Sequence, residues 1–105
     1  MIKVQFLDGR VEKFIDSLEK ETIARVLRTI DLLQNFGPAL GPPHSKKIES
    51  HLFELRVRGR QDVRILYAFH GGVAMLVHGF VKKSQRIPSK EIKIARHRLK
   101  TLDHI

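Results

Sequence analysis

The apolar positions in the first third of the chain follow a helical period. Residues 2–7 alternate between apolar and polar side chains, as in a short strand. Over residues 9–19 and again over residues 23–33, apolar side chains recur at spacings of three and four. The two stripes consist of Val11, Phe14, Ile15, Leu18, Ile23, Val26, Leu27, Ile30 and Leu33. The pattern predicts two amphipathic helices that form an antiparallel hairpin, which Gly37 and Pro38 end.

Residues 37–47 break the helical pattern. Glycine and proline recur here, at Gly37, Pro38, Gly41, Pro42 and Pro43. This composition predicts an ordered loop that crosses from the helices to the next element. Lys46 and Lys47 close the loop.

The middle of the chain alternates with a period of two. Residues 52–58, 63–70 and about 73–82 therefore read as three strands, and Gly71-Gly72 as a tight hairpin turn. One predicted face is apolar and should pack on the helices: Phe53, Leu55, Val57, Val63, Ile65, Tyr67 and Phe69. The other face mixes charge with a few apolar residues: Glu54, Arg56, Arg58, Arg64, Leu66, Ala68, His70, Leu76, His78, Phe80 and Lys82.

A final helix follows Pro88, with Ser89 expected as its N-cap. Its apolar stripe consists of Ile92, Ala95, Leu99 and Leu102. This stripe is expected to cover the apolar members of the mixed sheet face and to leave a basic groove beside them. The fold class is α+β: an N-terminal strand, a helical hairpin, a three-stranded antiparallel meander and a C-terminal helix, in two layers. A chain of this length forms a single domain, residues 1–105.

The positive charge is distributed unevenly along the chain. The first 35 residues carry six basic and six acidic side chains, whereas residues 36–105 carry fourteen basic and five acidic, so the net charge of +9 comes from the second part. A one-sided excess of this kind is typical of a protein that binds a polyanion, most often nucleic acid. An acidic protein partner would balance the charge equally well.

Composition excludes several kinds of chemistry. The chain has no cysteine, which excludes disulfides, a thiolate nucleophile and cysteine-type zinc sites. Its histidines (His44, His51, His70, His78, His97 and His104) show no metal-binding spacing, and there is no G-x-S-x-G elbow. Neither a membrane-spanning run nor a signal-peptide core is present. We expect a cytoplasmic protein without metal or cofactor.

The basic residues of the mixed face suggest phosphodiester chemistry. Alternation places Arg56 and Arg64 on neighbouring strands, with Lys82 at the end of the third, and Lys83 and Arg86 follow in the loop. Guanidinium and ammonium groups hold phosphate oxygens and stabilise the extra charge of the transition state. RNA brings its own nucleophile, the 2′-hydroxyl, so that only a general base and acid are needed.

For the base, Glu54 is the first candidate and His78 the second. Further RNA contacts are predicted for Arg58, Arg86, Lys46, Lys47, Lys90 and Lys93. The structural alternative stays open: the arginines can be a solvated edge, and Glu54 can be an ion-pair partner of Arg64 or Lys82.

Several motifs in this second part of the chain resemble the RelE/HigB superfamily, the toxins of bacterial type II toxin–antitoxin modules. They are Leu52-Phe53-Glu54-Leu55-Arg56, Val63-Arg64-Ile65-Leu66-Tyr67, His78-Gly79-Phe80-Val81-Lys82-Lys83, and Pro88 with the helix from Glu91 to Leu99. The strand end that contains Gly-Phe-Val-Lys-Lys, followed by a helix that starts at proline, resembles the phage-derived HigB-like branch. The likeness extends over essentially the whole chain.

The resemblance implies a small α+β sheet with a helical hairpin, and metal-independent cleavage of mRNA on the ribosome by the 2′-hydroxyl. It also implies a cognate antitoxin, often a HigA-like helix-turn-helix protein. The family's central arginine matches Arg64, and its flanking basic residues match Arg56, Lys82 and Lys83. Glu54 and Pro88 depart from the RelE pattern, which has lysine and tyrosine there, so the acid and base are not carried over from the family.

Three hypotheses follow. The first is a ribosome-dependent endoribonuclease toxin. The second is a non-catalytic nucleic-acid-binding module that uses the same groove. The third is a protein whose charge complements an acidic regulator.

Overall fold

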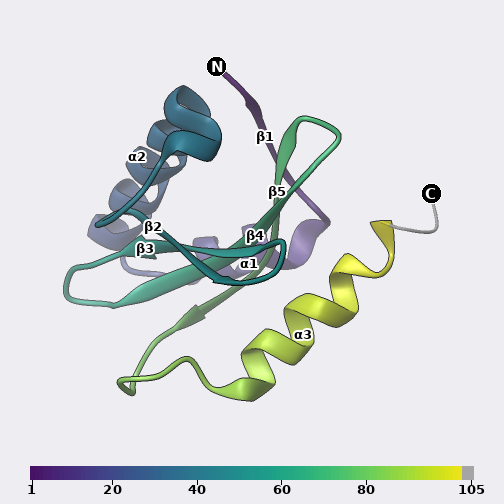
Figure 1. The fold of residues 1–105 in the computed structure, drawn as a ribbon. Coiled ribbons are helices and arrows are strands. Elements are labelled where there is room, and N and C mark those ends of the chain that lie inside the picture. The colour runs from purple at the N-terminus through teal and green to yellow at the C-terminus, as the bar shows by residue number, and fades with distance from the viewer. Residues whose placement is uncertain (103–105) are drawn as a thin grey trace.

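A computed structural model describes residues 1–102 and shows one five-stranded sheet with helices on both faces (Figure 1). The strands are β1 (Lys3–Phe6), β2 (Ser45–Glu49), β3 (Leu52–Val57), β4 (Val63–His70) and β5 (Val73–Val81). The helices are α1 (Gly9–Asp16), α2 (Lys20–Phe36), the 3-10 turn η1 (Gly37–Ala39) and α3 (Ser89–Leu99). The predicted α+β class and order of elements are confirmed.

The strands lie in the order β1-β5-β4-β3-β2, with β1 parallel to β5 and all other pairs antiparallel. The meander therefore has four strands, one more than predicted. The prediction of a loop through Lys46 and Lys47 was wrong, because Ser45–Glu49 forms the edge strand β2. Only Ser45 is buried and Ile48 half-buried in this strand, so the apolar alternation was too weak to reveal it. Lysines on an edge strand discourage pairing with another chain.

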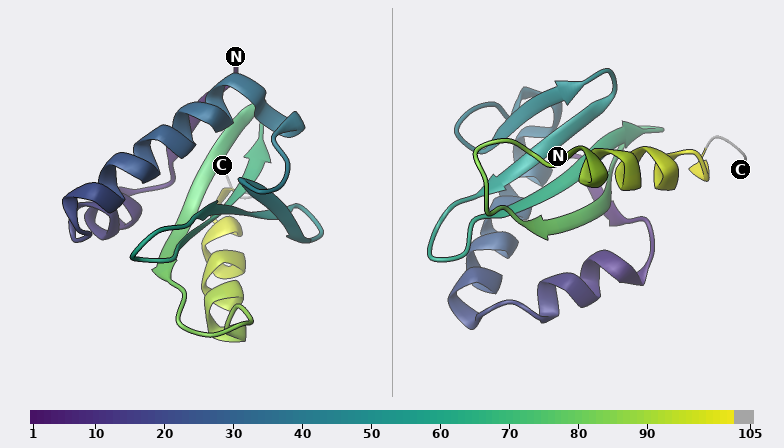
Figure 2. Two further views of the ribbon diagram at one scale, coloured as in Figure 1. Left: turned by 90° about the vertical axis from the view of Figure 1, so that its left-hand side faces the viewer. Right: turned by 90° about the horizontal axis from the view of Figure 1, so that it is seen from below.

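The first two helices cover one face of the sheet, as predicted (Figure 2). α1 packs on β5, and α2 packs on β3 and β1. The Asp8 side chain caps α1 by accepting a hydrogen bond from the Arg10 amide at 2.9 Å. The core between helices and sheet contains the predicted stripe residues Val11, Ile15, Leu18, Val26 and Leu33 together with Leu55, Val57, Val63, Ile65, Tyr67, Ala74 and Leu76.

α3 packs on the opposite face of the sheet, against β5 and β4 (Figure 1). A second core lies beneath it, formed by Leu52, Leu66, Val77, Phe80 and Ala95, with Ile92 and Leu99 packed alongside. Leu102 is also buried, so the predicted apolar stripe is confirmed. The expectation that Ser89 caps this helix was wrong: Pro88 occupies the cap position, no side chain supplies a cap hydrogen bond, and Ser89 is the first helical residue.

A β-bulge in β5 changes which side chains face α3. Leu66 lies opposite His78 but Tyr67 lies opposite Leu76, so Val77 is an extra residue in β5. Val77 belongs to the core under α3, whereas Leu76 belongs to the core under α1 and α2. The prediction that Leu76 shares a face with Phe80 was therefore wrong, because strict alternation does not hold across the bulge.

None of the helices in residues 1–102 is both long and apolar enough to span a membrane.

Candidate nucleic-acid interface

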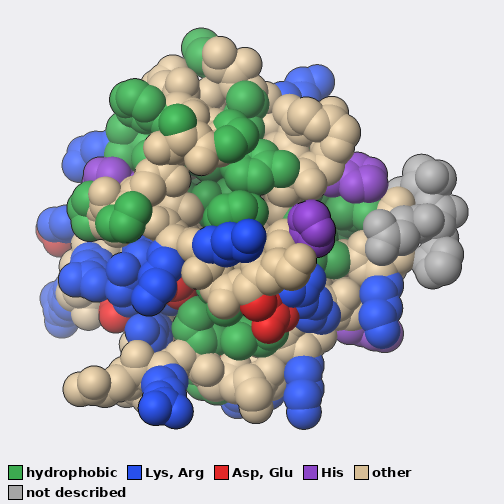
Figure 3. Space-filling model, viewed as in Figure 1, with side chains coloured by type: hydrophobic (Ala, Val, Ile, Leu, Met, Phe, Trp, Pro, Cys, Tyr) green, Lys and Arg blue, Asp and Glu red, His purple; other side chains and the backbone are tan. Residues whose placement is uncertain are grey.

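A cavity of about 370 Å³ opens between β2, β3, the loop after β5 and the start of α3. We call it the basic groove. Five cations line it, namely Lys46, Lys47, Arg56, Lys82 and Arg86. The remaining lining residues are Glu54, Gln85, Ile48, Ile87 and Ile92. On the face shown in Figure 3, Lys and Arg side chains border a hydrophobic patch between the front strands and α3.

Strand pairing explains why these residues meet. Glu54 and Arg56 alternate onto the α3 face of β3, and the register pairs Lys46 with Glu54 across β2. The Lys82 amide donates to the Asp62 carbonyl at 2.7 Å, which holds the end of β5 beside the start of β4. The structure thus brings six predicted site residues to one groove: Glu54, Arg56, Lys82, Arg86, Lys46 and Lys47.

Arg64 does not line this groove. It is 2% exposed and is the largest fully buried side chain in the described residues. Its Nη1 lies 2.9 Å from Asp62 Oδ1, and its Nε lies 3.6 Å from Glu54 Oε2. Burial lowers the pKa of Arg64, and the carboxylates of Asp62 and Glu54 act against that shift. An arginine nevertheless keeps its charge in a protein.

Glu54 connects the buried arginine to the groove. It is 4% exposed, and its second oxygen, Oε1, lies 3.3 Å from Arg56 Nε. The chain of charges therefore runs from Asp62 through Arg64 and Glu54 to Arg56. Several of its nitrogen and oxygen atoms (Glu54 Oε2, Arg56 Nε, Asp62 Oδ1, Arg64 Nε and Nη1) are buried without a well-formed hydrogen bond. Their ion pairs hold these groups, and Glu54 and Arg56 are the members that line the basic groove.

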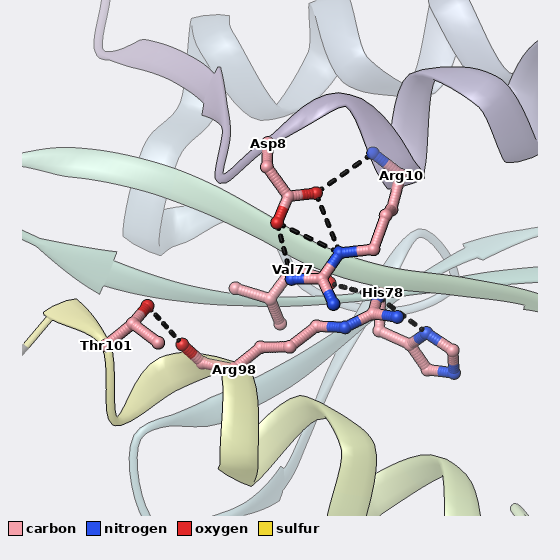
Figure 4. Close-up of polar contacts among 6 residues, drawn as sticks. All are labelled: Asp8, Arg10, Val77, His78, Arg98 and Thr101. Atoms are coloured by element: carbon pink, nitrogen blue, oxygen red, sulfur yellow. Dashed lines mark hydrogen bonds and ion pairs between the residues drawn. The ribbon is translucent and has the colours of Figure 1, made fainter.

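His78 lies between β5 and α3, outside the lining of the groove. Its Nε2 lies 3.1 Å from Glu91 Oε1. On the other side of the ring, its Nδ1 lies 3.2 Å from Arg98 Nη1 (Figure 4). Because arginine can only donate, Nδ1 is the acceptor and Nε2 carries the proton that Glu91 accepts. Burial lowers the pKa of His78, opposed by Glu91, so the neutral ring is favoured. Its ring stacks on Phe80, with centroids 5.7 Å apart.

Arg98 ties the same region together. Its Nη1 donates to the carbonyl of the bulged residue Val77 at 2.9 Å (Figure 4). Asp8 and Arg10 form an ion pair nearby, and the Arg10 hydrogen bonds lower the pKa of Asp8 to about 2. The two Arg98 contacts connect α3 to Val77 and His78 of the bulged strand.

The other predicted RNA contacts lie elsewhere. Lys83 and Lys90 are exposed and do not line the basic groove. Lys93 lines a separate concavity of α3 with Arg10 and Arg98. Arg58 lines a concavity on the α2 side of the sheet, beside Arg25 and Arg28.

Among residues 1–102, no group of three or more His, Cys, Asp or Glu residues is placed to hold a metal ion. His104 lies outside the described residues.

Sequence reasoning missed two groups of groove residues. Ile48, Ile87 and Gln85 form part of the basic groove, but they belong to an unrecognised strand and to an irregular loop. Arg25 and Arg28 were overlooked because the first 35 residues have no net charge. The local signal was there, since a spacing of three places both arginines on one side of a helix.

Two proteins of Mycobacterium tuberculosis are similar to part of this chain. A protein of Mycobacterium tuberculosis named "Putative toxin HigB3" is 39% identical over 64 residues, which cover 57% of this chain and 55% of that protein. A second, named "Putative toxin HigB2", is 36% identical over 66 residues, which cover 57% of this chain and 33% of that protein. The matched region therefore spans about half or less of these relatives.

Residues 13–100 match the family described as "Phage derived protein Gp49-like (DUF891)". The match includes the end of α1, all of α2, every strand of the meander and α3. The resemblance to the phage-derived HigB-like branch is thereby confirmed, and this chain belongs to the phage-derived Gp49-like family.

Proposed function

We propose that this protein is the toxin of a type II toxin–antitoxin module and that it cleaves mRNA bound to the ribosome. The observation that supports this most directly is the basic groove, where five cations and one carboxylate surround a cavity of about 370 Å³. This volume is within the range of cavities that hold small organic ligands, about 300–1,000 Å³. The relatives named as toxins support the same proposal.

In the proposed reaction, the RNA supplies the nucleophile. The 2′-oxygen attacks the adjacent phosphorus, a P–O2′ bond forms, and the P–O5′ bond breaks. Glu54 accepts the proton of the 2′-hydroxyl, and the Lys82 ammonium gives a proton to the departing 5′-oxygen. The products are a 2′,3′-cyclic phosphate and a free 5′-hydroxyl. Arg56 binds the non-bridging oxygens, whose negative charge grows in the transition state.

Arg64 has an indirect role in this proposal. Its guanidinium is too deeply buried to reach a phosphodiester, but it holds Glu54, which in turn pairs with Arg56. Arg64 is therefore proposed as a positioning residue.

The proposed partners are mRNA, the ribosome and a cognate antitoxin, for which a HigA-like helix-turn-helix protein is the candidate. Action on ribosomes also implies a cytoplasmic location.

The test is to map mRNA cleavage by the purified protein with and without ribosomes. The variant Arg56→Ala/Lys82→Ala removes two groove cations, and the matched control Lys3→Ala/Lys13→Ala removes two exposed cations outside the groove. We expect ribosome-dependent cleavage with cyclic phosphate ends, slowed by about 100-fold or more in the groove variant because transition-state charge is no longer stabilised. The control should cleave as the wild type does.

Intact mRNA with the wild-type protein on ribosomes would refute the nuclease proposal. If the wild type binds RNA without cleaving it, the non-catalytic module becomes the better description.

A further inference from the structure

A second concavity lies on the other face of the sheet, between α2, the end of the loop before β2, and β3. We call it the arginine groove, and its volume is about 250 Å³. The arginine and histidine side chains that line it are Arg25 and Arg28 from α2, His44 from the loop, Arg56 from β3 and Arg58 just after β3. The rest of its lining contains no acidic residue.

Three of the four arginines in the arginine groove have no carboxylate partner within the described residues. Within residues 1–102, no carboxylate lies within 4 Å of the guanidinium of Arg25, Arg28 or Arg58. The Arg25 guanidinium donates one long hydrogen bond, of 3.5 Å, to the Arg58 carbonyl. Cations that share a concavity repel one another, and a bound anion removes that repulsion. The arrangement therefore favours an anionic ligand.

Arg56 connects this groove to the basic groove, because it lines both. The register explains how: β2 begins at Ser45, opposite Leu55, so Arg56 lies just beyond the paired part of β2 and β3. The Arg56 amide pairs instead with the His44 carbonyl at 2.8 Å, at the mouth of the arginine groove. A ligand that contacts Arg56 therefore lies next to both grooves.

We propose that the arginine groove binds RNA phosphates that flank the nucleotide held in the basic groove. This inference rests on the proposed function, since it assumes that the basic groove holds RNA. Planar guanidinium groups suit phosphate oxygens, and a strand whose phosphate contacts Arg56 carries further phosphates on both sides of it. Arg25 and Arg28 then extend the binding site by several nucleotides without taking part in cleavage.

The test uses fluorescence anisotropy with RNAs made uncleavable by 2′-deoxy sugars at the central positions, so that binding is measured whether or not the protein is a nuclease. The variant Arg25→Ala/Arg28→Ala is compared with Lys13→Ala/Lys20→Ala, which also removes two exposed cations from the first two helices. All four side chains are exposed, so both variants should fold, which thermal unfolding verifies.

We expect the arginine variant to bind a single-stranded dodecanucleotide about tenfold or more weakly than the control does. A trinucleotide, which occupies the basic groove alone, should bind equally to both. Each lost contact should also reduce the salt dependence of dodecanucleotide binding by about 0.7 in log–log slope. A hairpin RNA is the third ligand tested. If the arginine variant also binds the hairpin more weakly than the control does, the arginine groove binds phosphates of a separate RNA as well as those of the same strand.

Equal binding of the dodecanucleotide and the hairpin by both variants would overturn the inference while leaving the proposed function intact. If the arginine variant then bound a polyglutamate peptide more weakly than the control does, the arginine groove would instead be a binding site for an acidic protein partner. Failure of the proposed function has a different signature, namely intact mRNA on ribosomes, whatever the arginine variant does in this binding assay.

Discussion

Arg64 and Glu54 have different surroundings although they are predicted on the same sheet face. The alternating pattern correctly predicted that both side chains lie on the sheet face opposite α1 and α2. How deeply each side chain is buried depends on the packing around it. Arg64 lies on the inner strand β4 between β3 and β5, and it is 2% exposed. Glu54 is nearly as buried, yet it borders the groove. Burying an ion pair costs desolvation energy. Removing one partner costs more, because it leaves the other charge buried and unpaired.

Arg64→Ala should destabilise the fold strongly. It removes the cation between Asp62 and Glu54 and leaves the buried Glu54 with Arg56 alone. Breaking a buried pair costs about 3–5 kcal/mol of unfolding free energy. Urea denaturation measures this, with the exposed Arg58→Ala as a control that should change stability by less than about 0.5 kcal/mol. A loss below about 1 kcal/mol for Arg64→Ala would show that the buried network contributes little.

The His78 ring should make stability depend on pH. Burial lowers its pKa in the folded protein below the ordinary value of 6.5. Below about pH 6.5 the unfolded chain therefore takes up a proton that the folded protein refuses, and stability falls as the pH falls. Above that pH both states are neutral and this contribution is constant. His78→Gln keeps a donor for Glu91 and an acceptor for Arg98 but cannot titrate.

Thermal unfolding of wild type and His78→Gln between about pH 5 and pH 8 checks this expectation. The wild type should lose more stability than the variant on the acid side. Parallel curves for the two proteins would mean that His78 titrates alike in the folded and unfolded states.

At the scale of elements, β5 determines how both helical layers meet the sheet. Its bulge at Val77 turns two consecutive side chains, Val77 and His78, toward α3. On its other face, Gly79 lies directly under the ring of Phe14 from α1. The absence of a side chain at Gly79 therefore leaves room for the Phe14 ring against β5.

Gly79→Ala should loosen the contact between α1 and β5. A methyl group at this position would lie 2.5 Å from Phe14 Cδ2, so the ring or the helix has to move. Overpacking of this kind costs about 1–3 kcal/mol of unfolding free energy. Gly41→Ala is the matched control, since a methyl group there meets nothing within 4 Å. Urea denaturation of both variants tests the idea, and equal midpoints would contradict it.

At the scale of the whole molecule, the fold gathers charges from distant parts of the chain. The basic groove takes lysines from β2, arginine from β3 and further cations from the loop after β5. The arginine groove adds side chains from α2, in the part of the chain that is neutral overall. Two adjoining cationic grooves that share Arg56 are expected to attract a polyanion from a distance.

RNA binding should therefore depend steeply on salt. If all five cations of the basic groove contact phosphates, the log–log slope of affinity against salt is about −3.5, at about −0.7 for each contact on a single strand. Anisotropy titrations between about 50 and 200 mM KCl measure the slope. A slope near zero would show that the groove cations do not meet the RNA backbone.

The periodicity of the chain by itself determined the α+β class, the first two helices, three of the four meander strands and the stripe of α3. A helix or strand that buries one face must place apolar residues at a regular spacing, and this spacing can be read directly from the sequence. Tertiary structure decided three other features: the strand Ser45–Glu49, the bulge at Val77 and the depth of Arg64. The edge strand carries few apolar residues, so its sequence shows little alternation. The bulge depends on the register between β4 and β5, and the burial of Arg64 depends on which elements pack over it. The convergence of Glu54, Arg56 and Lys82 was expected from alternation, whereas the connection through Arg56 to Arg25 and Arg28 needed the folded chain.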